Sequence, residues 1–503
     1  MVDPLHREQI LRVLEAALRA VDPQEAVRDH VARDGDLLRI GPQSYCLDEI
    51  GRVIVVGGGK AGAPMAAAVA EIVGDRISAG VVNVKYGHTA SAGDWQVRFE
   101  GRSPDVILSG SERQSPLRNQ KSEESPCHRR AAAGVPDPPR VAGPITLIEA
   151  GHPLPDTAGQ AGAGRIVSLL QGLTDRDLVI VLLSGGGSAL LPLPAPGLTL
   201  ADLQALTDVL LRCGATINEI NAVRKHCSRI AGGQLARLAA PAQVATLILS
   251  DVVGSPLDSI ASGPTVPDPT TCADALAVLH RYDIADQVPA GVRYHLQRGA
   301  AGVFPDTPKP GDPLFGRVNN VVIGDNASAG RAAVAEARRL GFQSSLLTTF
   351  VQGEVREVGR VVAGLAQGIV CGQSDFVPPA CLVLGGETTV TIRGAGKGGR
   401  NQELALAAAI ELDGYKLQSD SLRPSGAEVA VVSLATDGND GPTDAAGGIA
   451  TADTVARGRA LGLDARAALA ANDSYTCLAA LGALIVTGPT NTNVNDLIFV
   501  FAF

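Results

Sequence analysis

Two glycine-rich loops carry the residues of this sequence that are best suited to binding an anion. Residues 57 to 62 read Gly-Gly-Gly-Lys-Ala-Gly, which places Lys60 within the first loop, and residues 184 to 188 read Ser-Gly-Gly-Gly-Ser. The backbone N–H groups of such loops can converge on one phosphate or carboxylate, and a lysine adds a mobile positive charge. A tight turn without a ligand is the alternative interpretation of each loop. The candidate binding residues are Gly59, Ser184, Gly185, Gly186, Gly187 and Ser188.

A third candidate is the basic stretch of residues 221 to 226, which reads Asn-Ala-Val-Arg-Lys-His. In a helix, Asn221 and Lys225 share one face because they are four residues apart, and Arg224 lies beside them. We therefore expect Asn221 and Arg224 to bind substrate or phosphate. A solvated basic helix face is the alternative, and His226 by itself is interpreted as structural.

Three carboxylates are candidates for holding a metal ion. Asp251 follows an apolar run, Glu387 lies in Gly-Gly-Glu-Thr, and Asp437 lies in Ala-Thr-Asp-Gly. Carboxylate oxygens suit Mg²⁺, and a carboxylate can also orient a substrate hydroxyl. We predict a metal-binding or hydroxyl-binding role for these three residues. Capping of a turn is the alternative for Asp251, and the sequence does not decide which of the three acts as a base.

The string of residues 396 to 403, Gly-Lys-Gly-Gly-Arg-Asn-Gln-Glu, opens an expected helix. It offers Arg400 as a catalytic candidate, and Asn401 and Glu403 as candidates for binding substrate or phosphate. One lysine, one arginine, several carboxylates and many glycines together suit phosphoryl transfer. In that reaction a protein mainly supplies positioning, positive charge and a place for a metal ion.

Short apolar runs alternate with helical patterns along the chain, and the two glycine-rich loops each follow one of the runs. This alternation predicts an α/β fold with a largely parallel, doubly wound sheet, in which ligands bind beyond the carboxyl ends of the strands. The expected strands are residues 52 to 56, 79 to 84, 177 to 183, 245 to 249, 319 to 323, 344 to 348, 380 to 384 and 429 to 433, with a hairpin at 388 to 393. The expected helices lie within residues 6 to 33, 63 to 73, 159 to 170, 200 to 211, 218 to 238, 328 to 340, 355 to 365, 402 to 412 and 454 to 461.

The chain of 503 residues is long enough for two domains. The proline-rich stretch at residues 306 to 313 predicts a boundary near residue 312. We expect a Rossmann-like domain over residues 6 to 312 and a smaller α/β domain over residues 316 to 503. Residues 96 to 143 are rich in serine, proline, arginine and glycine, so we predict a disordered insertion there.

Composition excludes several classes of function. The chain has 43 Lys and Arg against 52 Asp and Glu, a formal charge of −9, and only 3% aromatic residues. A nucleic-acid partner is not expected, because neither a basic field nor stacking platforms are present. The sequence lacks an apolar run of bilayer-spanning length and a signal-peptide pattern. The eight cysteines form no CxxC pair, so we predict neither a zinc site nor a disulfide framework, and a cytoplasmic location.

Ordered strings along most of the chain resemble the glycerate 2-kinase family, whose C-terminal part is the MOFRL domain. The resemblance implies a Rossmann-like domain, a smaller MOFRL domain, an active site in the cleft between them, and a kinase that uses ATP and Mg²⁺ to phosphorylate D-glycerate. It also implies that Lys60 and Arg400 are the functional pair. Two departures are Asn491 and Ala435, where the family usually has glycine, although Asn tolerates a left-handed backbone. The matching strings are residues 84 to 88, 151 to 156, 183 to 188, 214 to 226, 249 to 252, 260 to 265, 385 to 389, 398 to 404, 436 to 438, 487 to 490 and 492 to 496.

Two other functions remain open at this point. A nicotinamide-dependent hydroxypyruvate reductase is suggested by the Gly-x-Gly-x-x-Gly pattern of residues 57 to 62. The following strand ends in Asn83-Val-Lys85, where a nicotinamide site usually places a carboxylate for the ribose, and this counts against a reductase. A sugar-acid-binding protein without catalysis is the second alternative. For the kinase and for the reductase alike, the assembly that we expect is a homodimer.

Overall fold

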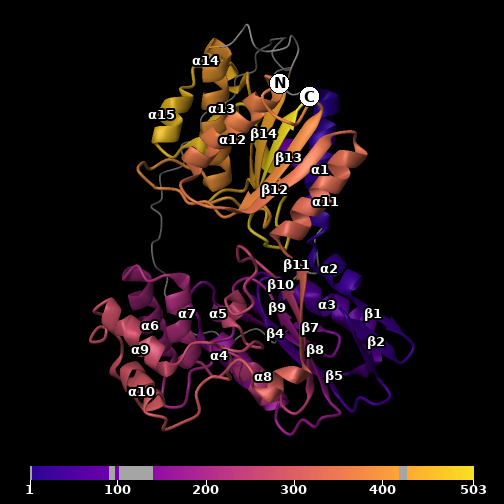
Figure 1. Ribbon diagram of the computed structural model, residues 1–503, viewed down its shortest axis with the longest axis vertical. Helices are drawn as coiled ribbons and strands as arrows, with labels where there is room; N and C mark the ends of the chain where they lie inside the picture. Colours follow the sequence, from indigo (N-terminus) through magenta and orange to yellow (C-terminus); the bar gives the residue numbers. More distant parts are fainter. Residues whose placement is uncertain (1–2, 90–96, 101–139, 419–427) are drawn as a thin grey trace, which may run out of the picture.

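Two α/β domains, each built on a seven-stranded sheet, are stacked along the long axis of the molecule (Figure 1). The computed structural model describes residues 3–89, 97–100, 140–418 and 428–503. The expected α/β fold class is confirmed. Within the described residues, no helix combines the length and apolar character that crossing a bilayer requires.

The sheet of the first domain has the strand order β11-β10-β9-β4-β5-β8-β7 and is parallel except for β7. From β4 the chain adds β5 and β8 on one side, and then β9, β10 and β11 on the other. The strand order therefore reverses between β4 and β9, and in sheets of this kind the crevice beyond that point binds ligands. The strands are β4 Val53–Gly58, β5 Ile77–Lys85, β7 Arg140–Ala142, β8 Ile145–Ala150, β9 Leu178–Leu183, β10 Gln243–Leu249 and β11 Val318–Gly324.

Both β4 and β9 are buried along their whole length, as apolar runs in the middle of a parallel sheet should be. Four helices, α6, α7, α9 and α10, form a separate group with its own core beside the sheet (Figure 1). The expected helix of residues 218 to 238 is in fact two helices, α7 and α8. The helices of this domain are α2 Pro23–His30, α3 Gly62–Val73, α4 Thr157–Leu169, α5 Gly187–Leu190, α6 Leu200–Arg212, α7 Ile217–His226, α8 Gln234–Ala239, α9 Cys272–Arg281 and α10 Ala290–Ala300. A small antiparallel sheet lies at its edge, with β1 Val31–Asp34, β2 Leu37–Ile40 and β3 Gln43–Cys46.

The sheet of the second domain is mixed, with the order β12-β13-β17-β14-β15-β16-β6. Strand β17 runs antiparallel to both β13 and β14, so the ends of β13 and β14 and the start of β17 lie at one edge. The strands are β6 Arg98–Glu100, β12 Gln343–Val351, β13 Ala380–Gly386, β14 Val429–Ala435, β15 Gly447–Thr451, β16 Leu484–Val486 and β17 Asp496–Ala502. The helices are α11 Asn326–Arg339, α12 Val355–Val370, α13 Arg400–Gln418, α14 Thr454–Ala460, α15 Ala465–Ala470 and α16 Ser474–Ala480.

The sheets divide the chain at a different place from the boundary that we expected near residue 312. Strand β11, at residues 318–324, pairs with β10 and completes the first sheet, whereas α11 packs on the second. Helix α1, Pro4–Arg19, packs on α11 although it begins the chain, and Arg12 is paired with Glu336 (Figure 1). Neither domain is therefore a single continuous segment of the chain.

Two further expectations concern an insertion at residues 96 to 143 and a hairpin at residues 388 to 393. The insertion expected at residues 96 to 143 has described ends, β6 in the second sheet and β7 in the first, while residues 101 to 139 lie outside the described residues. The hairpin expected at residues 388 to 393 is wrong. Only an isolated bridge between Glu354 and Thr389 forms there, and Thr391 donates its backbone N–H to the Glu354 carboxylate instead of to a strand.

Candidate active site

The two glycine loops meet at the point where the strand order of the first sheet reverses. The N–H of Lys60 donates to the carbonyl of Gly185 (2.9 Å), and the N–H of Ala61 donates to the hydroxyl of Ser184 (3.0 Å). Gly59 has a φ of +156°, and a Cβ on it would lie 2.1 Å from Ser184 Oγ. The loops can therefore come this close only because Gly59 has no side chain.

Asp251, after β10, brings a carboxylate against the same loops. A Cβ on Gly185 would lie 2.2 Å from Asp251 Oδ2, so this glycine also leaves room for a neighbour. Burial raises the pKa of Asp251 to about 6, although the positive charge of Lys60 lowers it. Among the described residues, no other side chain donates a hydrogen bond to this carboxylate. Asp251 is thus a partly buried group that can change protonation near neutral pH.

Two histidines that the sequence did not mark as site residues lie beside Lys60. His152 covers Gly186, whose Cβ, if present, would be 2.8 Å from the imidazole Cδ2. Burial, with the positive charges of Lys60 and Lys85, lowers the pKa of His152 to about 4, and burial also lowers the pKa of His88. Both imidazoles are therefore neutral at pH 7. Both histidines lie in strings that support the family resemblance. The sequence did not indicate their role, because a single histidine in a loop does not reveal which side chains will surround it.

Arg400, the first residue of α13, is held by Asp496, the first residue of β17. Arg400 Nη2 donates to Asp496 Oδ1 (3.0 Å), and Nε donates to the other carboxylate oxygen. Burial disfavours the charged guanidinium, but this bidentate contact outweighs it and raises the pKa of Arg400. Nη1 lies 3.9 Å from Glu387 and points away from Asp496. Arg400 is therefore a fixed rather than a mobile cation. Its partner Asp496 was not among the residues that the sequence analysis assigned to the site.

Charges of the two domains act on one another at this edge. Burial raises the pKa of Glu387, Arg400 and Lys60 lower it, and Glu387 in turn raises that of Asp251. The domains also touch nearby, since a Cβ on Gly254 would lie 2.9 Å from the ring of Phe350. We call the following set the interdomain site: Lys60, Asp251, Glu387, Arg400 and Asp437.

Two predicted ligand-binding residues are instead engaged within the second domain. Glu403 is buried, with Arg356 Nη2 at 2.6 Å and Asn472 Nδ2 at 3.0 Å from its carboxylate oxygens. Asn401 is also buried and bonds Asp440 and Asp496. Asp440 accepts the backbone N–H groups of residues 401 and 402 and so caps α13. These residues hold the helix that carries Arg400, and the structure does not place Glu403 in the interdomain site.

Arg224 lines a small cavity beside the serine–glycine loop, and Asn221 lies behind it, where its Oδ1 accepts from the hydroxyl of Ser262 (3.3 Å). The cavity of about 50 Å³ is lined by Ser188, Thr207, Arg224 and Ser262, among others. The guanidinium of Arg224 is largely buried, which lowers its pKa, and its contact with Thr207 Oγ1 is long, at 3.5 Å. Within the described part of the chain, no carboxylate pairs with Arg224, and the buried Nδ2 of Asn221 has no partner. A buried cation without a counter-ion is costly, so this cavity is suited to a small anion.

The three carboxylates predicted to bind a metal do not form one compact set of ligands. In the described ranges, the only group with three ligand atoms within 4.8 Å of one another is His226, Cys272 and Asp306, which lies elsewhere. Mg²⁺ usually keeps several waters and is bound by one or two carboxylates together with substrate phosphates. The charge of Asp437 helps to raise the pKa of Glu387, so these two carboxylates lie near each other and fit that second pattern.

Comparison with known proteins identifies relatives over the full length of the chain. Residues 9–297 match the family model described as a domain of unknown function (DUF4147), and residues 380–496 match the MOFRL family. The glycerate 2-kinase of Pyrococcus horikoshii is 38% identical, with 98% of this chain and 96% of that protein covered. A protein of Agrobacterium vitis that carries the provisional name hydroxypyruvate reductase is 38% identical over 98% of this chain and 93% of its own. The crystal structure of the Thermotoga maritima glycerate kinase matches with a TM-score of 0.77 at 36% identity, covering all of both chains.

The position of Lys60 beside His152 can be tested without any substrate. Because the Lys60 ammonium helps to lower the pKa of His152, Lys60→Ala should raise that pKa, while burial keeps it below its usual value. NMR titration of ¹³C-labelled histidine measures the change. Arg165→Ala, which removes an exposed charge of α4, is the control and should leave His152 unaffected. An unchanged His152 titration in Lys60→Ala would show that the ammonium lies elsewhere.

Proposed function

The chain belongs to the glycerate 2-kinase family that combines a DUF4147 domain with a MOFRL domain, and we propose that it transfers the γ-phosphoryl group of ATP to the 2-hydroxyl of D-glycerate. The observation that carries this proposal is the interdomain site. It combines a glycine-rich anion loop and Lys60 from one sheet with Arg400 and two carboxylates from the other. Such a set supplies the positioning and the charge that phosphoryl transfer needs.

In this proposal the transferring phosphoryl group lies between Lys60 and Arg400. The backbone N–H groups of Gly185, Gly186 and Ser188 lie at or just before the start of helix α5 and would provide donors for phosphate oxygens, whereas the N–H of Gly187 donates to the Ser184 carbonyl (3.2 Å). Asp496 occupies Nε and Nη2 of Arg400, and Nη1, which lies 3.9 Å from Glu387, would reach an anion between the domains. Glu387 and Asp437 would hold Mg²⁺ together with the nucleotide, and the ion would neutralise phosphate charge.

Asp251 is the best candidate for the base. It lies against the anion loop, it has no competing side-chain donor among the described residues, and its pKa is near 6. It would accept the proton of the 2-hydroxyl as the new O–P bond forms and the bond from the γ-phosphorus to ADP breaks. A base is most effective when its pKa lies near the working pH.

The carboxylate of glycerate would bind at the small cavity, to Arg224 and Asn221. Arg224 would gain the counter-ion that it lacks, and the Nδ2 group of Asn221 would gain an acceptor. Ser188 lies both in this cavity and in the anion loop, so a three-carbon acid bound here would have its hydroxyl close to the phosphoryl group.

The reductase alternative has weaker support from the structure. Asn83, near the end of β5, is buried and donates to the carbonyls of Gly159 and Leu190. Lys85 is the last residue of that strand. A nicotinamide site would bind the ribose hydroxyls at the end of this strand with a carboxylate. This strand ends instead with Asn83, whose amide is already hydrogen-bonded, and with the cation Lys85.

One assay separates the two activities and tests the two cations. With D-glycerate, ATP and Mg²⁺ the enzyme should form ADP, and with hydroxypyruvate and NADH it should not consume NADH. Lys60→Ala and Arg400→Ala should each lower kcat by about 10²-fold to 10³-fold, as expected for lost transition-state donors. Arg165→Ala should retain normal kinetics. Oxidation of NADH without ADP formation would reject the kinase, and a normal kcat in either variant would remove that residue from the site.

Arg224 should affect substrate binding more than turnover. Arg224→Ala should raise KM for glycerate by about 10-fold to 100-fold, the range for a lost charge-assisted hydrogen bond, and leave KM for ATP nearly unchanged. Arg212→Ala, on the exposed surface of the neighbouring helix α6, is the matched control. An equal rise in both KM values would place Arg224 at the nucleotide instead.

Asp251 should control the acidic side of the pH profile. A base must be deprotonated, so kcat/KM should fall about tenfold for each pH unit below about 6 and level off above pH 7. Asp251→Asn should lower the plateau by about 10²-fold to 10⁴-fold and abolish this acidic limb. Asp175→Asn, an exposed residue before β9, should keep the wild-type profile. An acidic limb that persists in Asp251→Asn would assign it to another group.

A further inference from the structure

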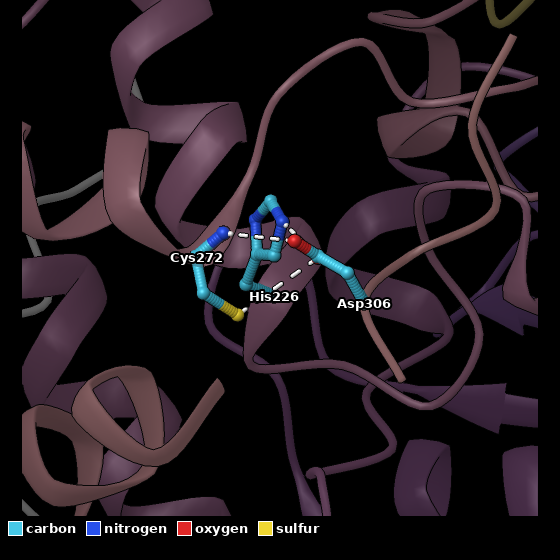
Figure 2. Close-up of side chains that lie close together, drawn as sticks. All are labelled: His226, Cys272 and Asp306. Carbon is cyan, nitrogen blue, oxygen red and sulfur yellow. Dashed lines mark hydrogen bonds and ion pairs between the residues drawn. The ribbon is translucent and has the colours of Figure 1, made fainter. Parts of the chain in front are cut away.

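A second cluster of reactive side chains lies in the first domain and takes no part in the proposed reaction. His226 ends α7, Cys272 begins α9, and Asp306 lies in the loop before β11; their side chains converge in Figure 2. His226 Nε2 is 2.8 Å from Asp306 Oδ1, and Cys272 Sγ is 3.9 Å from the same oxygen. His226 and Cys272 are buried, and Asp306 is partly buried.

The hydrogen bonds of His226 fix which ring nitrogen is available. Nδ1 lies 2.7 Å from the carbonyl of Ala222, and because a carbonyl only accepts, Nδ1 must carry the proton. In the neutral ring, Nε2 then presents a lone pair to the carboxylate oxygen of Asp306. Two acceptors at this distance need a positive species between them, which is either a second ring proton or a metal cation. A backbone carbonyl that orients the far nitrogen is typical of metal-binding histidines.

The ligand atoms are close to the spacing that tetrahedral Zn²⁺ requires. Zn–N and Zn–O bonds of about 2.0 Å and a Zn–S bond of about 2.3 Å put N and O about 3.3 Å apart and S and O about 3.5 Å apart. The distances here are 2.8 Å and 3.9 Å, so shifts of about half an ångström bring these two pairs to the required spacing, and the sulfur lies within 4.8 Å of the nitrogen. A divalent cation bound by a thiolate, a neutral imidazole and a carboxylate also leaves no net charge in the buried set.

The surroundings provide both access and supporting contacts. A cavity of about 500 Å³ is lined by all three residues and can supply a water as fourth ligand. The backbone N–H groups of Thr307 and Cys272 donate to the two oxygens of Asp306, at 2.8 Å and 3.2 Å, and orient the carboxylate. Lys309 Nζ lies 3.3 Å from Asp306 Oδ1 and competes with a metal, but this side chain is one third exposed and also bonds Thr307 Oγ1 and the carbonyl of Thr270.

We propose that His226, Cys272 and Asp306 form a site for a divalent transition-metal cation, with Zn²⁺ as the best match to its sulfur, nitrogen and oxygen ligands. The ion links the end of α7, the start of α9 and the loop at residue 306. Helix α7 also carries Asn221 and Arg224, so the metal stabilises the helix that supplies the proposed carboxylate site. Binding of the ion does not depend on the kinase proposal.

Titration of the metal-free full-length enzyme with Zn²⁺ and with Co²⁺ tests the site. Zn²⁺ should bind one per chain with roughly micromolar or tighter affinity and raise the melting temperature by a few degrees. Co²⁺ should show a thiolate charge-transfer band in the near ultraviolet and the visible bands of tetrahedral cobalt. Cys272→Ser should abolish the charge-transfer band and weaken Zn²⁺ binding by about 100-fold, since a protein ligand is lost.

The matched control is Cys213→Ser, which removes another free cysteine of the same helical group and should bind both metals like the wild type. If Cys272→Ser fails to fold, the charge-transfer band of Co²⁺ in the wild type, and its persistence in Cys213→Ser, still decide the question. Absence of the band, or Zn²⁺ binding that is unchanged in Cys272→Ser, would overturn the proposal. In that case His226 and Asp306 form a proton-mediated ion pair.

Discussion

The contact between two glycine loops where the strand order reverses is the constraint on which the rest of this structure depends. The loops after β4 and β9 touch through Gly59 and Ser184, at a separation that leaves no room for a side chain on Gly59. Their approach brings Lys60 and Asp251 close to each other. Because the strands that carry them are buried and pair along their length, this geometry is set by the rigid core of the sheet and not by the loops alone.

The second domain holds one cation, Arg400, in a fixed orientation at the start of a helix. Asp440 caps α13, and Asp496 binds Arg400 through two hydrogen bonds. Glu403, in the first turn of the same helix, forms an ion pair with Arg356. Several polar residues of the Gly-Gly-Arg-Asn-Gln-Glu string thus help to hold the start of this helix in place. The domain presents Arg400 and the carboxylates of Glu387 and Asp437 to the glycine loops of its neighbour.

Helix α7 links the two chemically distinct places in the first domain. Its middle carries Asn221 and the partly buried Arg224, which has no carboxylate partner among the described residues. Its last residue, His226, belongs to the sulfur-containing cluster. A cation at that cluster would fix the end of the helix whose side chains face the small cavity. The proposed metal site and the proposed site for the glycerate carboxylate would therefore share one helix.

The sequence by itself determined the α/β class, most of the strands and the positions of the two glycine loops, because these depend on local patterns such as apolar runs that end in glycine. It also anticipated that Asn491 could replace a glycine, and this residue has a φ of +58°. Only the tertiary structure decided which polar residues meet. The pairings of Arg400 with Asp496 and of Glu403 with Arg356, the place of α1 and β11, and the cluster of His226 with Cys272 and Asp306 all join residues far apart in the chain. Such contacts follow from how helices and strands pack in three dimensions, and residue spacing along the sequence carries no record of that packing.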